Sequence, residues 1–155
     1  YDINGNLAGM GEIDNILINN ILDHEFYTTQ KKHSSDIKDF DINFVKGLSI
    51  ENALANLNYF SAKLIFENIK DKISENCIII LCGGGRKNKT LVLNLKKLIN
   101  VNIYNIDEYK IDGDFIESQA FGYLSVRSLY KKNISFPETT KVKKPITGGE
   151  LVKST

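Results

Sequence analysis

The sequence is short of the features that most often indicate a function class. It contains no tryptophan, one methionine, two prolines and two cysteines in 155 residues. Basic and acidic side chains nearly balance, giving a formal net charge of +1 and no basic field for nucleic acid or for an anionic membrane surface. The longest apolar run, residues 77–82, is far shorter than the roughly 20 residues of a membrane-spanning helix. We therefore expect a soluble globular domain with neither kind of partner.

The cysteines and histidines do not indicate a disulfide or a metal site. Cys77 and Cys82 fall in one apolar run, where strand geometry would place them about 16 Å apart, too far for a disulfide. We expect buried free thiols in a reducing compartment, which is typical of a cytoplasmic protein. His24 and His33 lack the spacing of zinc ligands, so no metal site is expected within this chain.

The spacing of apolar residues predicts alternating helices and strands. Helices are expected over residues 13–21, with Ile13, Ile16, Leu17 and Ile21 on one face, from a cap at Ser49 to about residue 73, and after a cap at Asn88. Residues 77–82 are apolar on both faces, as in an inner strand that helices cover on both sides, and residues 101–106 alternate as a second strand. A right-handed crossover would place the two strands parallel, and adjacent or nearly so.

The remaining segments complete the predicted fold. Residues 24–46 are expected to form a long surface loop, docked by Phe26, Tyr27, Phe40, Ile42, Phe44 and Val45. A last helix should start at Asp112 or Asp114 and end near residues 130–133, with Phe115, Ile116, Ala120, Tyr123 and Leu124 facing a core. The tail should be extended, with at most one short strand. The predicted class is α/β, with a few-stranded parallel sheet flanked by helices.

Gly83, Gly84 and Gly85 stand between the first predicted strand and the next helix. Without Cβ atoms their backbone can take positive φ values and come into contact with a ligand. The following helix has a positive dipole end and free N–H groups, which favour a phosphate, and Lys87 or Lys89 could add charge. Such a site would lie at the carboxyl end of the strand, where open α/β sheets bind ligands.

The glycine triplet alone does not decide between an anion site and a tight turn that binds nothing. The chain has no G-x-x-x-x-G-K-S/T spacing, and it has no G-x-G-x-x-G at this turn because position 88 is Asn. The two nucleotide-binding folds that carry those motifs are therefore disfavoured.

Several segments, in the right order, resemble the anhydro-N-acetylmuramic acid kinases. LCGGGRKNKT at residues 81–90 is similar to the family's C-G-G-G-A-R-N-P-T. DE at 107–108 and DFIESQAFGYLSVR at 114–127 are similar to D-E-L-G and D-A-M-E-A-M-A-F-A-W-L-A-V-R, and residues 1–5, 33–40 and 144–149 agree as well. The departures are Arg86, Lys89 and Asn56, where the family usually has a small residue, proline and threonine.

The resemblance implies part of an actin-like ATPase with two ribonuclease-H-like lobes. It places residues 1–155 in the C-terminal portion of the second lobe, and the start at Tyr1 is expected to be a cut edge. Family members cleave the 1,6-anhydro bond of anhydro-N-acetylmuramic acid with water and transfer the γ-phosphoryl group of ATP to O6 during peptidoglycan recycling. Such chemistry uses Mg²⁺ to hold the phosphates. The implied cofactors are thus ATP and Mg²⁺, and homodimerisation stays open.

The resemblance also assigns roles to single residues. Gly83, Gly84, Gly85 and Asn88 would contact the nucleotide, and Glu117 would bind sugar hydroxyls; the alternative for Glu117 is a solvated carboxylate in a first helical turn. The family's catalytic aspartate and its first-lobe phosphate motif precede the segment that matches residues 1–2. No catalytic residue is therefore expected in this chain, and the chain alone should be inactive without the missing first lobe.

Two other hypotheses remain open from the sequence. One is a non-catalytic nucleotide-binding or assembly domain of actin-like ancestry, such as a split gene product. The other is an unrelated flavodoxin-like domain.

Overall fold

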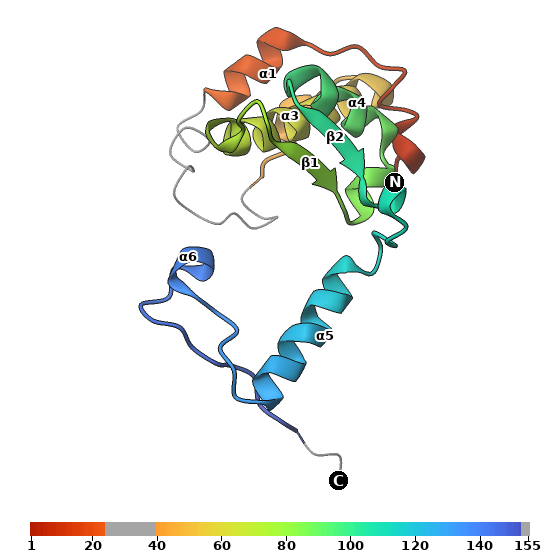
Figure 1. Ribbon diagram of the computed structural model, residues 1–155. Helices are drawn as coiled ribbons and strands as arrows, with labels where there is room; N and C mark the ends of the chain where they lie inside the picture. Colours follow the sequence, from red (N-terminus) through yellow and green to blue (C-terminus); the bar gives the residue numbers. More distant parts are fainter. Residues whose placement is uncertain (24–39, 153–155) are drawn as a thin grey trace.

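The computed structural model describes residues 1–23 and 40–152 and has a helix-and-strand body from which a helical arm extends (Figure 1). The elements in chain order are α1 (Asn15–Leu22), α3 (Ile50–Ile69), β1 (Ile78–Leu81), α4 (Lys89–Leu98), β2 (Asn102–Asn105), α5 (Ile116–Leu129) and α6 (Pro137–Thr140). Short 3-10 turns lie at Ile3–Gly5, Asn43–Val45, Lys70–Lys72, Gly84–Lys87 and Ile106–Tyr109. No helix within the described ranges is long and apolar enough to cross a membrane.

The two strands form a parallel pair. Ile79 lies opposite Ile103 and Leu81 lies opposite Asn105, and α4 makes the crossover between the strands. The prediction of a strand, glycine turn, helix and strand with parallel, adjacent strands is confirmed. Both strands therefore end at one edge, and the segments after Leu81 and after Asn105 leave the sheet side by side.

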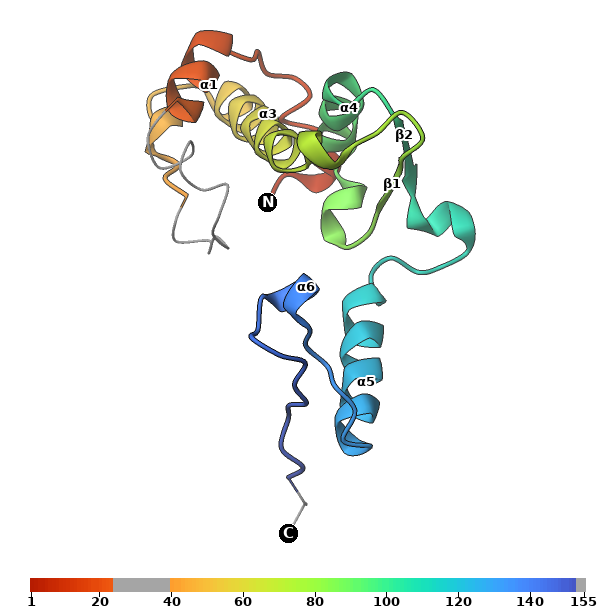
Figure 2. The same ribbon diagram turned by 60° about the vertical axis from the view of Figure 1, so that its left-hand side comes forward.

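A core forms between one face of this sheet and helices α3 and α4. Ala62, Leu95, Ile99 and Ile103 are its buried members, and Phe66 and Leu91 are among the apolar residues that pack around them. Ala62 has no exposed surface, so its small side chain lets α4 approach α3 closely. Figure 2 shows both helices on the same side of the strands.

The other face of the sheet is open among the described residues. Ile78 is 55% exposed and Ile80 is 44% exposed, so the described residues do not provide the expected helices on both sides of the first strand. The cause is that α3 and α4 both pack on one face. The expectation of two buried thiols is also wrong, because Cys77 is only half-buried and Cys82 is exposed.

An asparagine joins the N-terminal segment to α3. The side chain of Asn56, 1% exposed, accepts a hydrogen bond from the Asp14 amide at 2.9 Å and donates to the Glu12 carbonyl at 3.0 Å. Asp14 caps α1 through the amides of Ile16 and Leu17.

The predicted apolar face of α1 is partly wrong: Ile16 is exposed, and Ile18 is the fully buried residue.

The long polar loop is described only in its last part. Residues 24–39, which include Phe26, Tyr27 and both histidines, lie outside the described residues. In the described part, Val45 is buried and the ring centroid of Phe44 lies 5.2 Å from that of Phe60. Ile42 is exposed and does not dock the loop as predicted.

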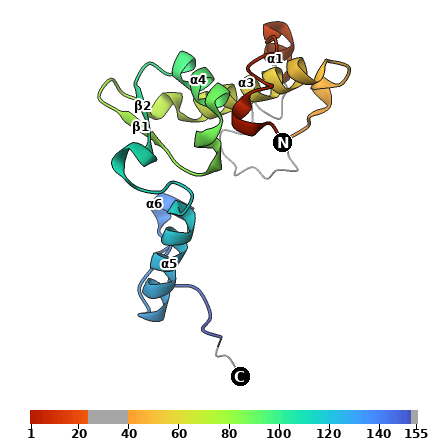
Figure 3. The ribbon, with the colours of Figure 1, turned by 90° about the vertical axis from the view of Figure 1, so that its right-hand side faces the viewer.

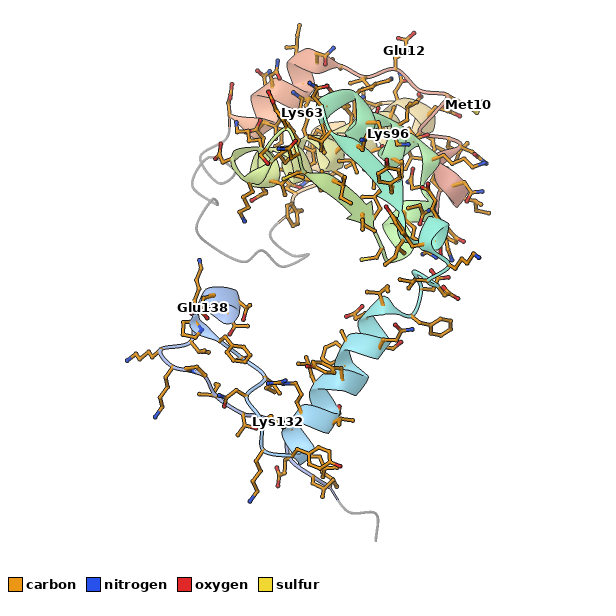
Figure 4. All side chains as sticks on the ribbon, in the orientation of Figure 1. Met10, Glu12, Lys63, Lys96, Lys132 and Glu138 are labelled. Atoms are coloured by element: carbon orange, nitrogen blue, oxygen red, sulfur yellow. The ribbon has the colours of Figure 1, made fainter. Side chains whose placement is uncertain are left out.

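Helix α5 leads away from the body (Figure 3). None of its residues is buried, and the apolar side chains expected to face a core are largely exposed, Tyr123 by 62%. Figure 4 shows side chains standing clear on several sides of this helix. The helix starts at Ile116, later than predicted, because the Asp112 carboxylate accepts the Asp114 amide in a local turn.

The tail is mostly extended, as expected. An isolated antiparallel bridge joins Ser135 to Ile146. The short helix α6, with Pro137 in its first turn, was not predicted.

Candidate functional site

The glycine loop begins where β1 ends. Gly83 has φ 75° and ψ −179°, a backbone conformation that residues with a side chain rarely adopt. The 3-10 turn Gly84–Lys87 follows directly. A Cβ atom placed on Gly83 or on Gly84 would have no heavy atom within 4 Å. The backbone of this loop therefore faces open space into which a ligand can come close.

Asn88 begins α4 and ends a chain of side-chain amides. Its Oδ1 accepts the backbone amide of Leu91 at 2.9 Å and the Asn58 Nδ2 group at 3.1 Å. Asn58 in turn accepts a hydrogen bond from Asn94, which is 2% exposed, at 3.0 Å. A backbone N–H can only donate, so the Leu91 amide sets the direction of the whole chain of amides. The prediction that Asn88 caps this helix is confirmed.

The N-terminal segment lies against the first turn of α4. The Thr90 hydroxyl donates to the Gly5 carbonyl at 2.7 Å. Gly5 has φ 74°, and a Cβ atom there would lie 2.1 Å from Asn88 Oδ1, so only glycine fits. This helix end, which the sequence predicts to present free N–H groups, is thus partly occupied by residues of the chain itself.

Arg86 lies at the centre of an ion-pair cluster behind the glycine loop. Its side chain is only 3% exposed. The guanidinium donates to both carboxylate oxygens of Asp107, at 2.7 and 3.1 Å, and to Asp114 Oδ1 at 2.6 Å. It also donates to the Gly83 carbonyl at 2.9 Å, and Asp112 lies 3.8 Å away. Arg86 thus connects the glycine loop to the segment that follows β2.

Backbone hydrogen bonds reinforce this connection. The Gly83 amide donates to the Gly113 carbonyl at 3.0 Å, and the Gly113 amide donates to Asp107 Oδ1 at 3.1 Å. A Cβ atom on Gly113 would lie 2.3 Å from Arg86 Nε, so a side chain there would displace the guanidinium. Lys87 pairs with Asp114 from the solvent side.

The cluster is ionised at neutral pH. Hydrogen bonds from Arg86, and then from the Gly113 amide, lower the pKa of Asp107 to about 2. Lys87 and then Arg86 lower the pKa of Asp114. The two carboxylates raise the pKa of Arg86. Two cations thus face three carboxylates, and the cluster carries no surplus of positive charge.

Comparison with known proteins identifies the chain's relatives. The family model described as anhydro-N-acetylmuramic acid kinase matches residues 1–154. The chain belongs to the anhydro-N-acetylmuramic acid kinase family. It is 49% identical over 161 residues to the anhydro-N-acetylmuramic acid kinase of Pelagibacter ubique, covering 99% of this chain and 43% of that protein.

More distant members of the anhydro-N-acetylmuramic acid kinase family match over the same portion of the chain. The relatives from Zymomonas mobilis and Caulobacter vibrioides are 34% and 35% identical, over 97% and 98% of this chain. The chain covers 41% of each of these two proteins. It therefore spans less than half the length of the curated relatives it matches.

The structure brings most of the predicted site residues of this kinase family member together. Gly83, Gly84 and Gly85 form the open loop, and Asn88 follows one turn later with its Oδ1 engaged within the protein. Glu117 is exposed in the first turn of α5 and follows Gly113 by four residues, so the two Cα atoms are at most about 14 Å apart. The ligands of these residues remain predictions.

Sequence reasoning missed the cluster around Arg86. The sequence marks Arg86 only as a departure from the family, Asp107 only as a match to a family motif, and Asp114 only as such a match and as a possible helix start. A signal was present: the segments after two adjacent parallel strands emerge at the same edge of a sheet. An arginine after the first strand and three aspartates after the second should have been expected to meet there.

The described residues provide no complete Mg²⁺ site of their own. They contain no group of three or more histidine, cysteine, aspartate or glutamate side chains arranged to hold a metal. The carboxylates closest to the glycine loop are paired with Arg86 and Lys87. Mg²⁺ is commonly bound through substrate phosphates and one or two carboxylates, so part of its coordination need not come from this chain.

Proposed function

We propose that this chain supplies one wall of the ATP cleft in a kinase that acts on anhydro-N-acetylmuramic acid. In the proposed reaction, water adds to the anomeric carbon, the 1,6-anhydro bond breaks, and the released O6 takes the γ-phosphoryl group of ATP, leaving ADP. The observation that carries the proposal is the open backbone at Gly83 and Gly84, at the carboxyl end of β1. Open α/β sheets bind ligands at this edge, and family membership supports the same assignment.

The proposed role is nucleotide contact by Gly83, Gly84 and Gly85, with Asn88 at the helix start. Asn88 Oδ1 already accepts two hydrogen bonds, so the side-chain NH₂ group is the part of Asn88 that can donate to a ligand. Glu117 is proposed to reach sugar hydroxyls. The water-activating carboxylate and the remaining phosphate contacts, including those of Mg²⁺, would come from a first lobe. The chain itself would form the C-terminal portion of the second lobe, and the whole enzyme would act in the cytoplasm during peptidoglycan recycling.

Calorimetric titration with MgATP tests the nucleotide site. Gly84→Val should abolish binding because the new side chain occupies the space in front of the loop backbone, while the fold has room for it. Gly122→Val is a matched control, since Gly122 also has no heavy atom near its Cβ position but lies in α5. Equal binding by the wild type and Gly84→Val would remove the glycine loop from the site.

Incubation with MgATP and anhydro-N-acetylmuramic acid tests the division of the active site. The chain alone should release no phosphorylated sugar, because the proposed carboxylate that activates water lies in the first lobe. Turnover by the chain alone would overturn that part of the proposal.

A second candidate is a nucleotide-binding or assembly domain that works with a separately supplied lobe. The exposed apolar surfaces of β1 and α5 favour this candidate, because each lacks a cover among the described residues. The two candidates can be distinguished by mixing this chain with the part of a curated relative that it does not match. Restored turnover in the mixture would favour a kinase half, while a stable complex without turnover would favour assembly alone.

A further inference from the structure

The hydrogen-bond donors of Arg86 are almost entirely committed within the protein. A guanidinium has five N–H groups, and four of them are engaged by Asp107, Asp114 and Gly83. The fifth faces Asp112, with the nitrogen 3.8 Å from the carboxylate oxygen. With a side chain only 3% exposed, Arg86 cannot present a fork of donors to a phosphate without leaving this arrangement.

These contacts form a closed circuit. The Gly83 carbonyl accepts from Arg86, Arg86 pairs with Asp107, Asp107 accepts the Gly113 amide, and the Gly113 carbonyl accepts the Gly83 amide. The Gly83 peptide units are therefore held on both sides, by the carbonyl and by the amide. Gly83 also takes φ 75° and ψ −179°, a conformation that glycine reaches without strain, so these contacts select one of the several conformations that its backbone could adopt.

We propose that Arg86 is a positioning residue of the glycine loop: it ties Gly83 to Asp107 and Asp114 and keeps the loop in the conformation that receives a nucleotide phosphate. Arg86 itself does not contact the phosphate. The inference rests on the proposed function for its consequence on binding, but the tie between the loop and the segment after β2 can be measured without any nucleotide.

The alternative is that Arg86 turns outward and binds the phosphate directly. The two roles predict opposite effects of Asp107→Asn. If Arg86 binds phosphate, removing its strongest partner frees the guanidinium and strengthens ATP binding. If Arg86 positions the loop, the same change breaks the bidentate pair and weakens ATP binding, by about tenfold if the loop then holds its competent conformation about one tenth of the time.

Asp112→Asn is the matched control for charge. Like Asp107→Asn, it removes one negative charge beside the loop, but the Arg86 nitrogen is 3.8 Å from the Asp112 carboxylate, and asparagine can still accept the Asp114 amide. We expect its ATP affinity to stay within about twofold of the wild type, because 3.8 Å is beyond hydrogen-bond distance and an ion pair with an exposed carboxylate contributes little. Arg86→Lys completes the set: it keeps the charge but cannot bridge three partners, so it should not restore what Arg86→Ala loses.

The experiment measures ATP affinity by calorimetry and amide hydrogen exchange by mass spectrometry on the whole 155-residue chain. Exchange over residues 83–86 should speed up in Arg86→Ala and Asp107→Asn by about tenfold relative to Asp112→Asn, with peptides of α3 unchanged as evidence of an intact fold. Tighter ATP binding by Asp107→Asn, rescue by Arg86→Lys, or equal exchange in all variants would each overturn the proposal. If the wild type shows no ATP binding, the proposed nucleotide site fails, and the exchange comparison still decides whether Arg86 holds the loop.

Discussion

Replacing Asn56 by alanine should detach the N-terminal segment from α3. The Asn56 side chain makes three hydrogen bonds: to the Asp14 amide at 2.9 Å, the Glu12 carbonyl at 3.0 Å and the Asn52 carbonyl at 2.8 Å. The Asn52 carbonyl is inside α3 and keeps the helical bond from residue 56. The substitution therefore leaves two backbone groups, the Asp14 N–H and the Glu12 C=O, without a hydrogen-bond partner next to residue 56, which is 1% exposed.

The size of the effect follows from those two groups. A buried polar group left without a partner costs about 1–3 kcal/mol. Both groups lie in a partly buried segment that water can reach after a small movement, so we expect about 2–4 kcal/mol in the free energy of unfolding. With an unfolding slope of about 2 kcal/mol per molar urea, the midpoint should fall by about 1–2 M.

Urea unfolding followed by circular dichroism measures this change, with Asn68→Ala as the matched control. Asn68 lies on the same helix, is exposed, and donates only to the Leu64 carbonyl of that helix. Alanine there should change the free energy of unfolding by less than about 0.5 kcal/mol. Equal midpoints for the Asn56 and Asn68 variants would refute the reasoning, since the tertiary hydrogen bonds of Asn56 would then contribute nothing.

Three further predictions concern the cluster, the helix cap and the core. The pKa of Asp107 is depressed from 3.8 to about 2, so the unfolded chain binds more protons in acid; the stability from this pair should be complete above about pH 5 and be lost as pH falls towards 2. Urea midpoints measured from pH 5 to pH 2 should therefore fall less steeply with pH in Asp107→Asn than in the wild type. An equal fall in both would contradict the assignment. Asn88→Ala removes the cap of α4 and should cost about 1 kcal/mol in urea unfolding, with Asn88→Ser costing less. Leu95→Ala, at a position 4% exposed, should cost about 2–5 kcal/mol by the same assay, whereas Leu93→Ala, 53% exposed on the same helix, should cost far less.

Features that depend on nearby residues were predictable from the sequence. Ser49 caps α3 by accepting the Asn52 amide at 3.2 Å, and Asn88 caps α4, because a cap needs only a side-chain acceptor three residues before a free amide. The parallel pairing of β1 and β2 also followed, since a strand, helix and strand of this length have few ways to connect. The position of the glycine loop, between β1 and α4, was predicted correctly for the same reason.

Features that depend on residues far apart in the sequence were predicted less well. An apolar pattern shows which face is suited to burial but not which element covers it. Residues 78–81 are apolar on both faces, yet α3 and α4 cover only one, and Ile78 and Ile80 remain exposed. Helix α5 repeats the case, because its apolar side chains recur at helical spacing while none is buried. Arg86 is the opposite case: charged side chains are mostly exposed, but a sheet edge shared with three aspartates makes Arg86 less exposed than the neighbouring Lys87. In each case the local pattern was read correctly. What the sequence did not show was which distant residues the tertiary fold packs against that segment.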